Sequence, residues 1–161
     1  MNKEQFWKYF SPLQSDIFGL SMSILKNQQE AQDAIHEVLL KLWKKRKHIS
    51  SKRNIKSLTL KTTKNHCIDV LRKKQRNNIN IPANDYYLPD YEQVDLVGMV
   101  KKICQSLPEQ QRMVIELKDF GGYTYQEISE IMEISIPTLR VLLSRARKRI
   151  IKLIENETER V

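Results

Sequence analysis

The chain has 161 residues, a formal net charge of +9 and a sequence pI near 9.6. This excess of lysine and arginine favours a polyanionic partner, for which DNA, RNA and an anionic membrane surface are all candidates. The length suits one ordinary domain or two small helical ones. The two cysteines, Cys67 and Cys104, lie outside any CxxC motif, so neither a disulfide framework nor a zinc site is expected.

Several function classes are disfavoured by the motif content. The sequence has no glycine-rich phosphate loop, metal-ligand cluster or nucleophile motif, so we expect no enzymatic activity, cofactor, metal site or small-molecule substrate. It has no apolar run of about 18 residues, and its polar start disfavours a secretory signal. We therefore expect a cytoplasmic protein, with membrane-surface binding through basic amphipathic helices as an alternative.

Helices are predicted from the start of the chain. With four glycines and five prolines overall, and apolar residues at helical spacing, the whole protein is expected to be all-α. Ser11, Pro12 and Gln14 predict a helix start, with the serine as the N-cap of a capping box. The next helix is predicted from an apolar stripe at steps of three and four: Ala31, Ala34, Ile35, Val38, Leu39, Leu42 and Trp43.

The segment after Trp43 is intensely basic. Between Lys44 and Arg76 its only acidic residue is Asp69. A third long helix is predicted from about Ile55 to Arg76, with four residues pointing inward: Leu58, Thr62, Ile68 and Leu71. This concentration of cations is the strongest charge feature of the chain.

An Asn- and Pro-rich segment follows the basic helix. Between Asn77 and Met99 it carries four acidic residues and no lysine or arginine. Its composition suits neither helix nor strand. We interpret residues 77–98 as a flexible acidic linker that joins two small helical domains.

The C-terminal part opens with a second predicted capping box, formed by Ser106 and Glu109 around Pro108. The helix that it begins is predicted to stop at Gly121-Gly122, because glycine readily ends a helix.

A helix-turn-helix is predicted next. Thr124 with Glu127 caps its first helix, which runs from Tyr125 to about Met132 and buries Ile128, Ile131 and Met132. Ser135 caps the second helix, whose first turn tolerates Pro137. In this layout the second helix enters a DNA major groove.

The second helix has two distinct faces. Its predicted buried face is formed by Leu139, Leu142, Leu143, Ala146 and Ile150. Its opposite side carries hydroxyl, methyl and cationic groups that suit base edges: Thr138, Val141, Ser144, Arg145 and Lys148. The flanking cations are interpreted as phosphate contacts: Arg140, Arg147, Arg149 and Lys152. A solvated basic face is the alternative.

Motifs from both halves, in order, resemble the extracytoplasmic-function branch of the sigma-70 family. The sequence at 107–112, Leu-Pro-Glu-Gln-Gln-Arg, is similar to the Leu-Pro-Glu-x-x-Arg opening of the family's fourth region. The helix at 125–131 and the Leu-Ser-Arg-Ala-Arg run at 143–147 resemble its helix-turn-helix. Upstream, residues 30–33, 38–43 and 65–73 resemble the family's second region.

The resemblance implies two helical domains: region 2 at 1–76 and region 4 at 99–161, joined by the linker at 77–98. Region 2 would dock on core RNA polymerase, formed in part by the beta and beta-prime subunits, and open the minus-ten element of promoter DNA. Region 4 would read the minus-thirty-five element. An anti-sigma factor, often membrane-bound, is a further partner that the resemblance implies.

Site residues are carried over by position. The implied core-polymerase contacts are Asp33, His36, Glu37 and Leu40. The implied minus-ten contacts are Lys52, Arg53, Lys56, Lys61, Lys64, Asn65, Asp69, Arg72 and Lys73. The implied minus-thirty-five contacts are Ser135, Pro137, Thr138, Arg140, Val141, Ser144, Arg145 and Lys148.

Four positions depart from common family residues: His36, Leu58, Pro137 and Val141. A minus-thirty-five sequence preference is therefore not carried over from the family. Two structural alternatives stay open, with His36 as an ordinary surface histidine and Asp69 as a helix cap or an ion-pair partner of Arg72. For the whole protein, the alternative is a helix-turn-helix repressor or activator that acts without polymerase.

Overall fold

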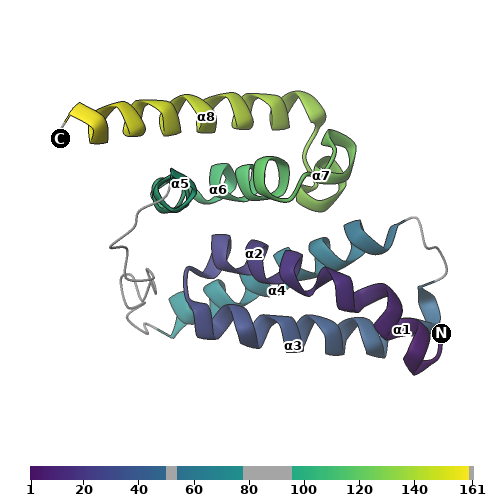
Figure 1. Ribbon diagram of the computed structural model, residues 1–161. Coiled ribbons are helices and arrows are strands. Elements are labelled where there is room, and N and C mark those ends of the chain that lie inside the picture. Colours follow the sequence, from purple (N-terminus) through teal and green to yellow (C-terminus); the bar gives the residue numbers. More distant parts are fainter. Residues whose placement is uncertain (50–53, 78–95, 160–161) are drawn as a thin grey trace.

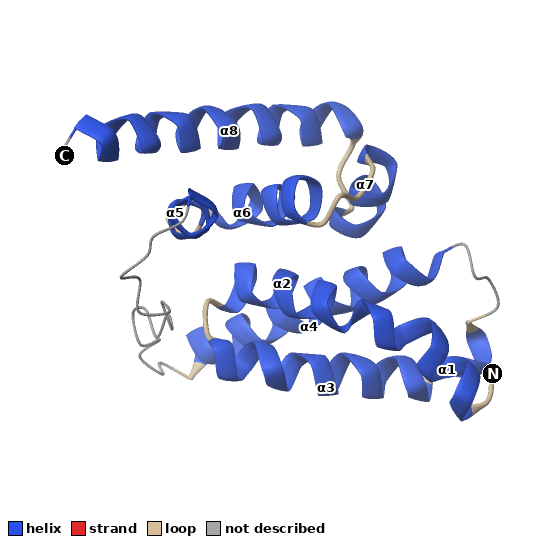
Figure 2. Ribbon diagram, viewed as in Figure 1, coloured by secondary structure: helices blue, strands red, loops and turns tan. Residues whose placement is uncertain are grey.

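The computed structural model describes residues 1–49, 54–77 and 96–159, and these residues are helical apart from short turns, with no strand among them (Figures 1 and 2). The predicted all-α class is confirmed. The helices are α1 (Lys3–Phe10), α2 (Gln14–Leu25), α3 (Gln28–Lys44), α4 (Ile55–Arg76), α5 (Leu96–Cys104), α6 (Glu109–Ile115), α7 (Tyr125–Met132) and α8 (Ile136–Glu159). Two 3-10 turns, η1 (Ser11–Leu13) and η2 (Arg46–His48), and a π-helical turn, η4 (Glu116–Phe120), complete the described elements.

Helices α1 to α4 form an N-terminal bundle. The apolar stripe predicted along α3 is confirmed, since six of its seven residues are buried and Trp43 is half-buried. One core cluster joins the C-terminal part of this stripe, Ile35 to Leu42, to the aromatic residues of α1 and to Ile17 of α2. The tilted rings of Phe6 and Phe10 lie 4.5 Å apart between centroids. Edge-on packing of Trp43 against Phe6, at 5.1 Å, fixes α1 across α3.

Two predicted capping boxes are wrong. Ser11 has the helical conformation and its N–H bonds back to the Trp7 carbonyl, so it ends α1 and cannot adopt the extended conformation of an N-cap. The hydroxyl of Ser106 donates to the Ile103 carbonyl at 2.7 Å, and α6 begins after Pro108 without a side-chain cap. A capping box exists instead at α1, between Asn2 and Gln5.

Helix α4 has the predicted bounds but a different buried face. The four residues predicted to point inward are only half-buried, and the buried residues are Ile55, Thr59, Leu60, Thr63, Lys64 and Cys67. Thr59 and Thr63 are buried because their hydroxyls donate to carbonyls four residues earlier, at 2.7 and 2.8 Å.

Helices α5 to α8 form a C-terminal bundle, in which α8 packs along α5, α6 and α7 (Figure 1). The predicted stop at Gly121-Gly122 is confirmed, because η4 ends at Gly121 and Gly122 has φ +72°, which a side chain disfavours. The core of this bundle contains residues from every helix, including Ile103, Met113, Ile128 and Leu143.

The two bundles are in direct contact. Helix α6 and η4 lie on α2, and α7 lies on α4, so the C-terminal bundle covers one side of the N-terminal bundle (Figure 1). A single apolar cluster runs through both, joining Leu20, Ile24 and Leu60 to Leu107 and Met113. Most of the predicted linker at 77–98 lies outside the described residues, at 78–95. Its last three residues are helical instead, because α5 begins at Leu96.

Candidate nucleic-acid and protein-binding surfaces

The helix-turn-helix has the predicted caps and core. The Thr124 hydroxyl accepts the Glu127 N–H at 3.1 Å, and the Glu127 carboxylate accepts the Thr124 N–H at 3.3 Å. Ser135 caps α8 by accepting the Thr138 N–H at 3.3 Å. Four predicted inward residues of α8 are buried, and Leu142 is half-buried. These contacts fix the angle at which α8 leaves the turn.

The outer face of α8 is free for a ligand along its first turns. All eight predicted minus-thirty-five residues are exposed: Ser135, Pro137, Thr138, Arg140, Val141, Ser144, Arg145 and Lys148. Val141, an apolar residue, is 46% exposed. Between Ser135 and Lys152 the helix has no acidic residue. The face therefore combines cations, hydroxyls and one methyl-bearing residue, which suits a major groove.

Arg147 has a protein partner instead of the phosphate role predicted for it. Its guanidinium makes two bonds to the Asp119 carboxylate, at 2.7 and 3.2 Å. The hydrogen bond to Asp119 raises the pKa of Arg147 above its ordinary value. Because Asp119 belongs to η4, this bidentate pair fixes α8 to the π-helical turn.

The basic residues of α4 lie in two different environments: some are exposed, and others face the C-terminal bundle. Asn65, Asp69, Arg72 and Lys73 are exposed near its C-terminal end, where the last three line a shallow groove. Among the described side chains, Asp69 makes no ion pair with Arg72, so the structure does not support that alternative.

The remaining predicted minus-ten contacts differ in their exposure. Lys56 is exposed at the start of α4, whereas Lys52 and Arg53 lie outside the described residues. Lys61 and Lys64 face α7 of the C-terminal bundle, and both ammonium groups approach the Glu133 carboxylate, at 2.8 and 3.5 Å. Lys64 is only 6% exposed. In this arrangement Lys64 is closed to a nucleic acid, whereas the Lys61 side chain stays 44% exposed.

The predicted polymerase-docking residues share the outer face of α3. Asp33, His36, Glu37 and Leu40 are all exposed. An open groove between α1 and α3 continues from this face, and its lining includes His36, Leu40 and Trp7. Leu40 is 46% and Trp7 44% exposed, which gives the groove an apolar floor of the kind that binds another protein. Sequence reasoning did not include Trp7, although its position beside Phe6 in an amphipathic segment is a signal for it.

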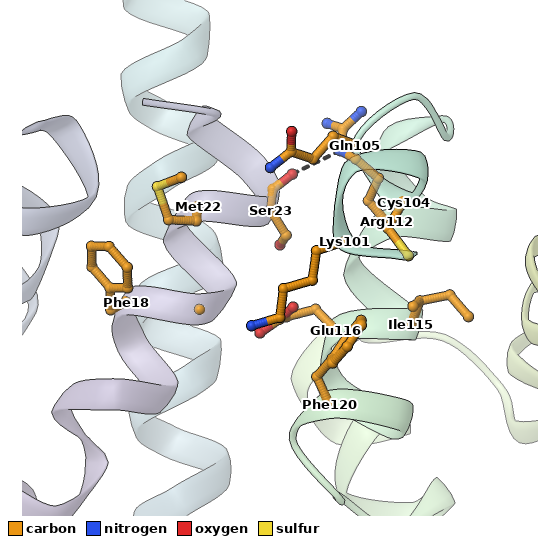
Figure 3. A pocket seen from close by; sticks show the side chains of 11 residues that line it. Phe18, Met22, Ser23, Lys101, Cys104, Gln105, Arg112, Ile115, Glu116 and Phe120 are labelled. Atoms are coloured by element: carbon orange, nitrogen blue, oxygen red, sulfur yellow. Dashed lines mark hydrogen bonds between the residues drawn. The ribbon is translucent and has the colours of Figure 1, made fainter. Parts of the chain in front are cut away.

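A cleft lies between the two bundles (Figure 3). Phe18 and Met22 of α2 line one side, and Lys101, Glu116 and Phe120 line the other. Burial raises the pKa of the Glu116 carboxyl; nearby Lys101 opposes that shift and Asp16 adds to it. The cleft thus holds a carboxylate in a setting that disfavours its charge.

Glu116→Gln is expected to stabilise the protein at neutral pH, by on the order of 1 kcal/mol. A carboxyl whose pKa is raised on folding binds its proton more tightly in the folded state, so stability falls as pH rises from the ordinary glutamate value through the raised one. The extra stability of Glu116→Gln over wild type should therefore be largest above the raised pKa and should disappear at more acidic pH. Thermal melts of both proteins across that range measure it, and a gain independent of pH would contradict the assignment.

Both cysteine thiols lie in surroundings that disfavour the reactive thiolate. Cys67 and Cys104 are free and buried, and burial raises the pKa of each to about 11.

Among residues 1–49, 54–77 and 96–159, no three His, Cys, Asp or Glu side chains gather into a metal-binding group. In those same ranges no helix combines the length and apolar character needed to cross a membrane.

Comparisons with known proteins match both bundles. Residues 9–77 match the family described as Sigma-70 region 2, and residues 99–150 match Sigma-70, region 4. RNA polymerase sigma-H factor of Pseudomonas aeruginosa is 23% identical over 158 residues, covering 88% of this chain and 82% of that protein. ECF RNA polymerase sigma factor SigK of Mycobacterium tuberculosis is 24% identical, covering 84% and 78%.

A third relative and one solved structure extend over nearly the whole chain. RNA polymerase sigma factor SigZ of Bacillus subtilis is 26% identical, covering 96% of this chain and 88% of that protein. The fold is similar to that of the sigma factor RpoE from Bartonella quintana, solved in complex with the anti-sigma factor NepR, with a TM-score of 0.81 at 23% identity over 94% of this chain and 98% of that one.

Proposed function

Because the chain belongs to the sigma-70 family, with a region 2 followed by a region 4, we propose that it is a sigma factor of the extracytoplasmic-function type that directs RNA polymerase to promoters. Its role is to bind core polymerase and to read the minus-ten and minus-thirty-five elements. Sigma factors are non-enzymatic regulators of transcription initiation, so the proposed role needs no catalytic group. We place it in the cytoplasm, with the polymerase and the promoter.

The observation that carries this proposal is the exposed face of α8. A helix-turn-helix holds that face rigidly, and its side chains include Arg145, which can bond guanine O6 and N7 together. We assign residues 99–161 to minus-thirty-five recognition. The cations beyond the reading face, including Arg149 and Lys152, are suited to phosphates, which fix the register of the helix without reading sequence.

Residues 1–76 are assigned to the minus-ten element and to the polymerase. The exposed C-terminal part of α4, with Asn65, Arg72 and Lys73, offers a cationic track for an opened strand. The outer face of α3 is assigned to core polymerase. The residues between α4 and α5, 77–95, are assigned as the linker between the two DNA-reading parts.

An anti-sigma factor is a further proposed partner. The structurally similar RpoE was solved in complex with the anti-sigma factor NepR. By analogy, we propose that a protein of this class holds the present sigma factor inactive until a signal releases it.

Run-off transcription with core RNA polymerase tests the function. The purified protein, added to core enzyme, should produce discrete transcripts from a set of genomic promoters that core enzyme alone does not start. A repressor or activator that acts without polymerase would instead bind duplex DNA tightly by itself. Absence of stimulated transcripts together with absence of core binding in a pull-down would overturn the proposal.

Arg145→Ala should weaken recognition of the minus-thirty-five element by about 1–3 kcal/mol, the range for a good bidentate contact to a base. The side chain is exposed and lies outside the core, so the fold should be unchanged. Binding of holoenzyme to promoter duplexes with each base substituted in turn measures the loss. Arg149→Ala is the matched control on the same helix, and it should weaken binding equally for all sequences. Unaltered base selectivity in Arg145→Ala would reassign that residue to a phosphate.

A further inference from the structure

Val141 is an apolar residue on the otherwise polar outer face of α8. It is 46% exposed, whereas Leu139 and Leu143, two residues away on either side, are 0% and 1% exposed. Two residues correspond to a rotation of about 200° around a helix, so Val141 faces away from the core of the C-terminal bundle. Valine is also a weaker helix former than leucine, lysine or glutamate. Neither core packing nor helix propensity therefore accounts for a valine at this position.

The side chains around Val141 divide the outer face of α8 into two parts. Its neighbours one turn earlier are Pro137 and Thr138, and a neighbour one turn later is Arg145; all three are exposed. The Thr138 hydroxyl is already bonded to the Ser135 hydroxyl, at 2.8 Å. The first part of the face thus offers few free hydrogen-bonding groups, and the part that follows is cationic.

Two other cations of α8 contact the rest of the C-terminal bundle. Arg147 is bonded to a carboxylate of η4, and the Arg140 guanidinium lies 5.5 Å from the ring centroid of Tyr125 on α7. Within the described parts of the chain, no hydrogen bond, ion pair or ring contact joins the Arg145 guanidinium to another residue. The first turns of a recognition helix make its base contacts. Val141 and Arg145 are therefore well placed to reach base edges.

A valine side chain distinguishes bases through apolar contact alone. In the major groove, thymine is the one base that presents a methyl group, and the other base edges present hydrogen-bond donors and acceptors. A valine against guanine or cytosine removes water from those polar groups and offers no hydrogen bond in return. Against thymine, it buries the methyl group of the base. Both effects favour thymine at the position that the valine contacts.

We propose that Val141 selects a thymine in the minus-thirty-five element by contact with its 5-methyl group, and that Arg145 reads a guanine nearby. Four residues rise about 6 Å along a helix, and successive base pairs are about 3.4 Å apart, so the two bases lie about two base pairs from each other. The inference rests on the proposed function, because it takes α8 as the helix that enters the promoter. Val141 departs from common family residues, so this preference belongs to the present chain.

Replacement of thymine by deoxyuridine tests the contact, because it removes the 5-methyl group and nothing else. Each thymine of the minus-thirty-five element, on either strand, is replaced in turn in a promoter duplex, and the affinity of holoenzyme for each duplex is measured. Wild type should bind one of these duplexes about fourfold more weakly, the effect of one buried methyl group. At the same position, 5-methylcytosine should be bound more tightly than cytosine.

Val141→Ala is the diagnostic variant. Its fold should be unchanged, because the side chain is exposed and alanine favours a helix. It should bind the thymine and uracil duplexes equally, since alanine is too short to contact the methyl group. Arg149→Ala is the matched control, and it should weaken binding of both duplexes by the same factor and keep the fourfold difference. Val141→Ile should keep that difference as well.

The outcomes separate this inference from the proposed function. Where transcription succeeds, equal binding of every thymine and uracil duplex by wild type overturns the methyl contact. A fourfold difference that persists in Val141→Ala assigns the contact to another residue and also overturns it. Failure of transcription and core binding overturns the proposed function. The thymine and uracil comparison then uses duplexes that the free protein selects from a random library, and equal binding there, or the absence of any selected duplex, overturns the thymine contact too.

Discussion

Leu40→Asp is expected to weaken binding of core RNA polymerase by about 30-fold or more. Leu40 is 46% exposed and lines the apolar groove together with Trp7 and His36. Truncation of a hot-spot residue at the centre of a protein interface costs about 2 kcal/mol or more, and a buried unpaired carboxylate adds a desolvation penalty. Because the side chain is exposed in the free protein, its replacement should leave the fold intact. Titration of labelled protein with core enzyme measures the loss.

Val141→Asp provides a matched control in the other bundle. Val141 has the same exposed fraction, 46%, and the substitution introduces the same charge. This variant should bind core polymerase like wild type but lose promoter binding, because the new carboxylate faces DNA phosphates and base edges. Equal losses of core affinity in the two variants would show that α3 is not the docking surface.

Arg112→Met should destabilise the protein by about 3 kcal/mol. Methionine keeps the apolar stem but leaves the Ser23 and Leu107 carbonyls without their buried charged donor, and each such bond contributes about 1.5–3 kcal/mol. The two losses are not additive, since they share one side chain. Urea unfolding followed by far-ultraviolet circular dichroism measures the difference in the free energy of unfolding.

Arg149→Met is the control for loss of a guanidinium. Arg149 is exposed on α8, and substitutions at such positions change stability by about 0.5 kcal/mol or less. A loss at Arg112 as small as this would mean that water replaces the guanidinium at both carbonyls. The buried position of Arg112 makes that replacement unfavourable.

Local signals predicted much of the C-terminal bundle. The caps at Thr124 and Ser135, the stop at Gly121-Gly122 and the two faces of α8 all follow from short-range patterns, and the structure has each of them. The same kind of pattern failed at Ser11 and Ser106. In both cases a nearby carbonyl bonds the serine, through its N–H or its hydroxyl, and such competition depends on the path of the preceding helix.

The buried face of α4 was not predictable from hydropathy. Thr59, Thr63 and Lys64 are polar residues, yet they lie inward while Leu58 is half-buried. Bonds to backbone carbonyls allow the threonines to be buried. Glu133, a residue nearly 70 positions away in sequence, allows Lys64 to be buried. No window of the sequence contains both partners of that pair.

The sequence by itself determined the all-α class, the family, the helix-turn-helix and the exposed polar face of α8, because these depend on residues a few positions apart and on helical periodicity. Only the tertiary structure decided how the two bundles meet. It packed Arg112 of α6 against α2, paired Arg147 with Asp119 and turned Lys61 and Lys64 toward Glu133. Those contacts join residues distant in sequence, so they depend on the packing of two complete surfaces, which no local pattern encodes.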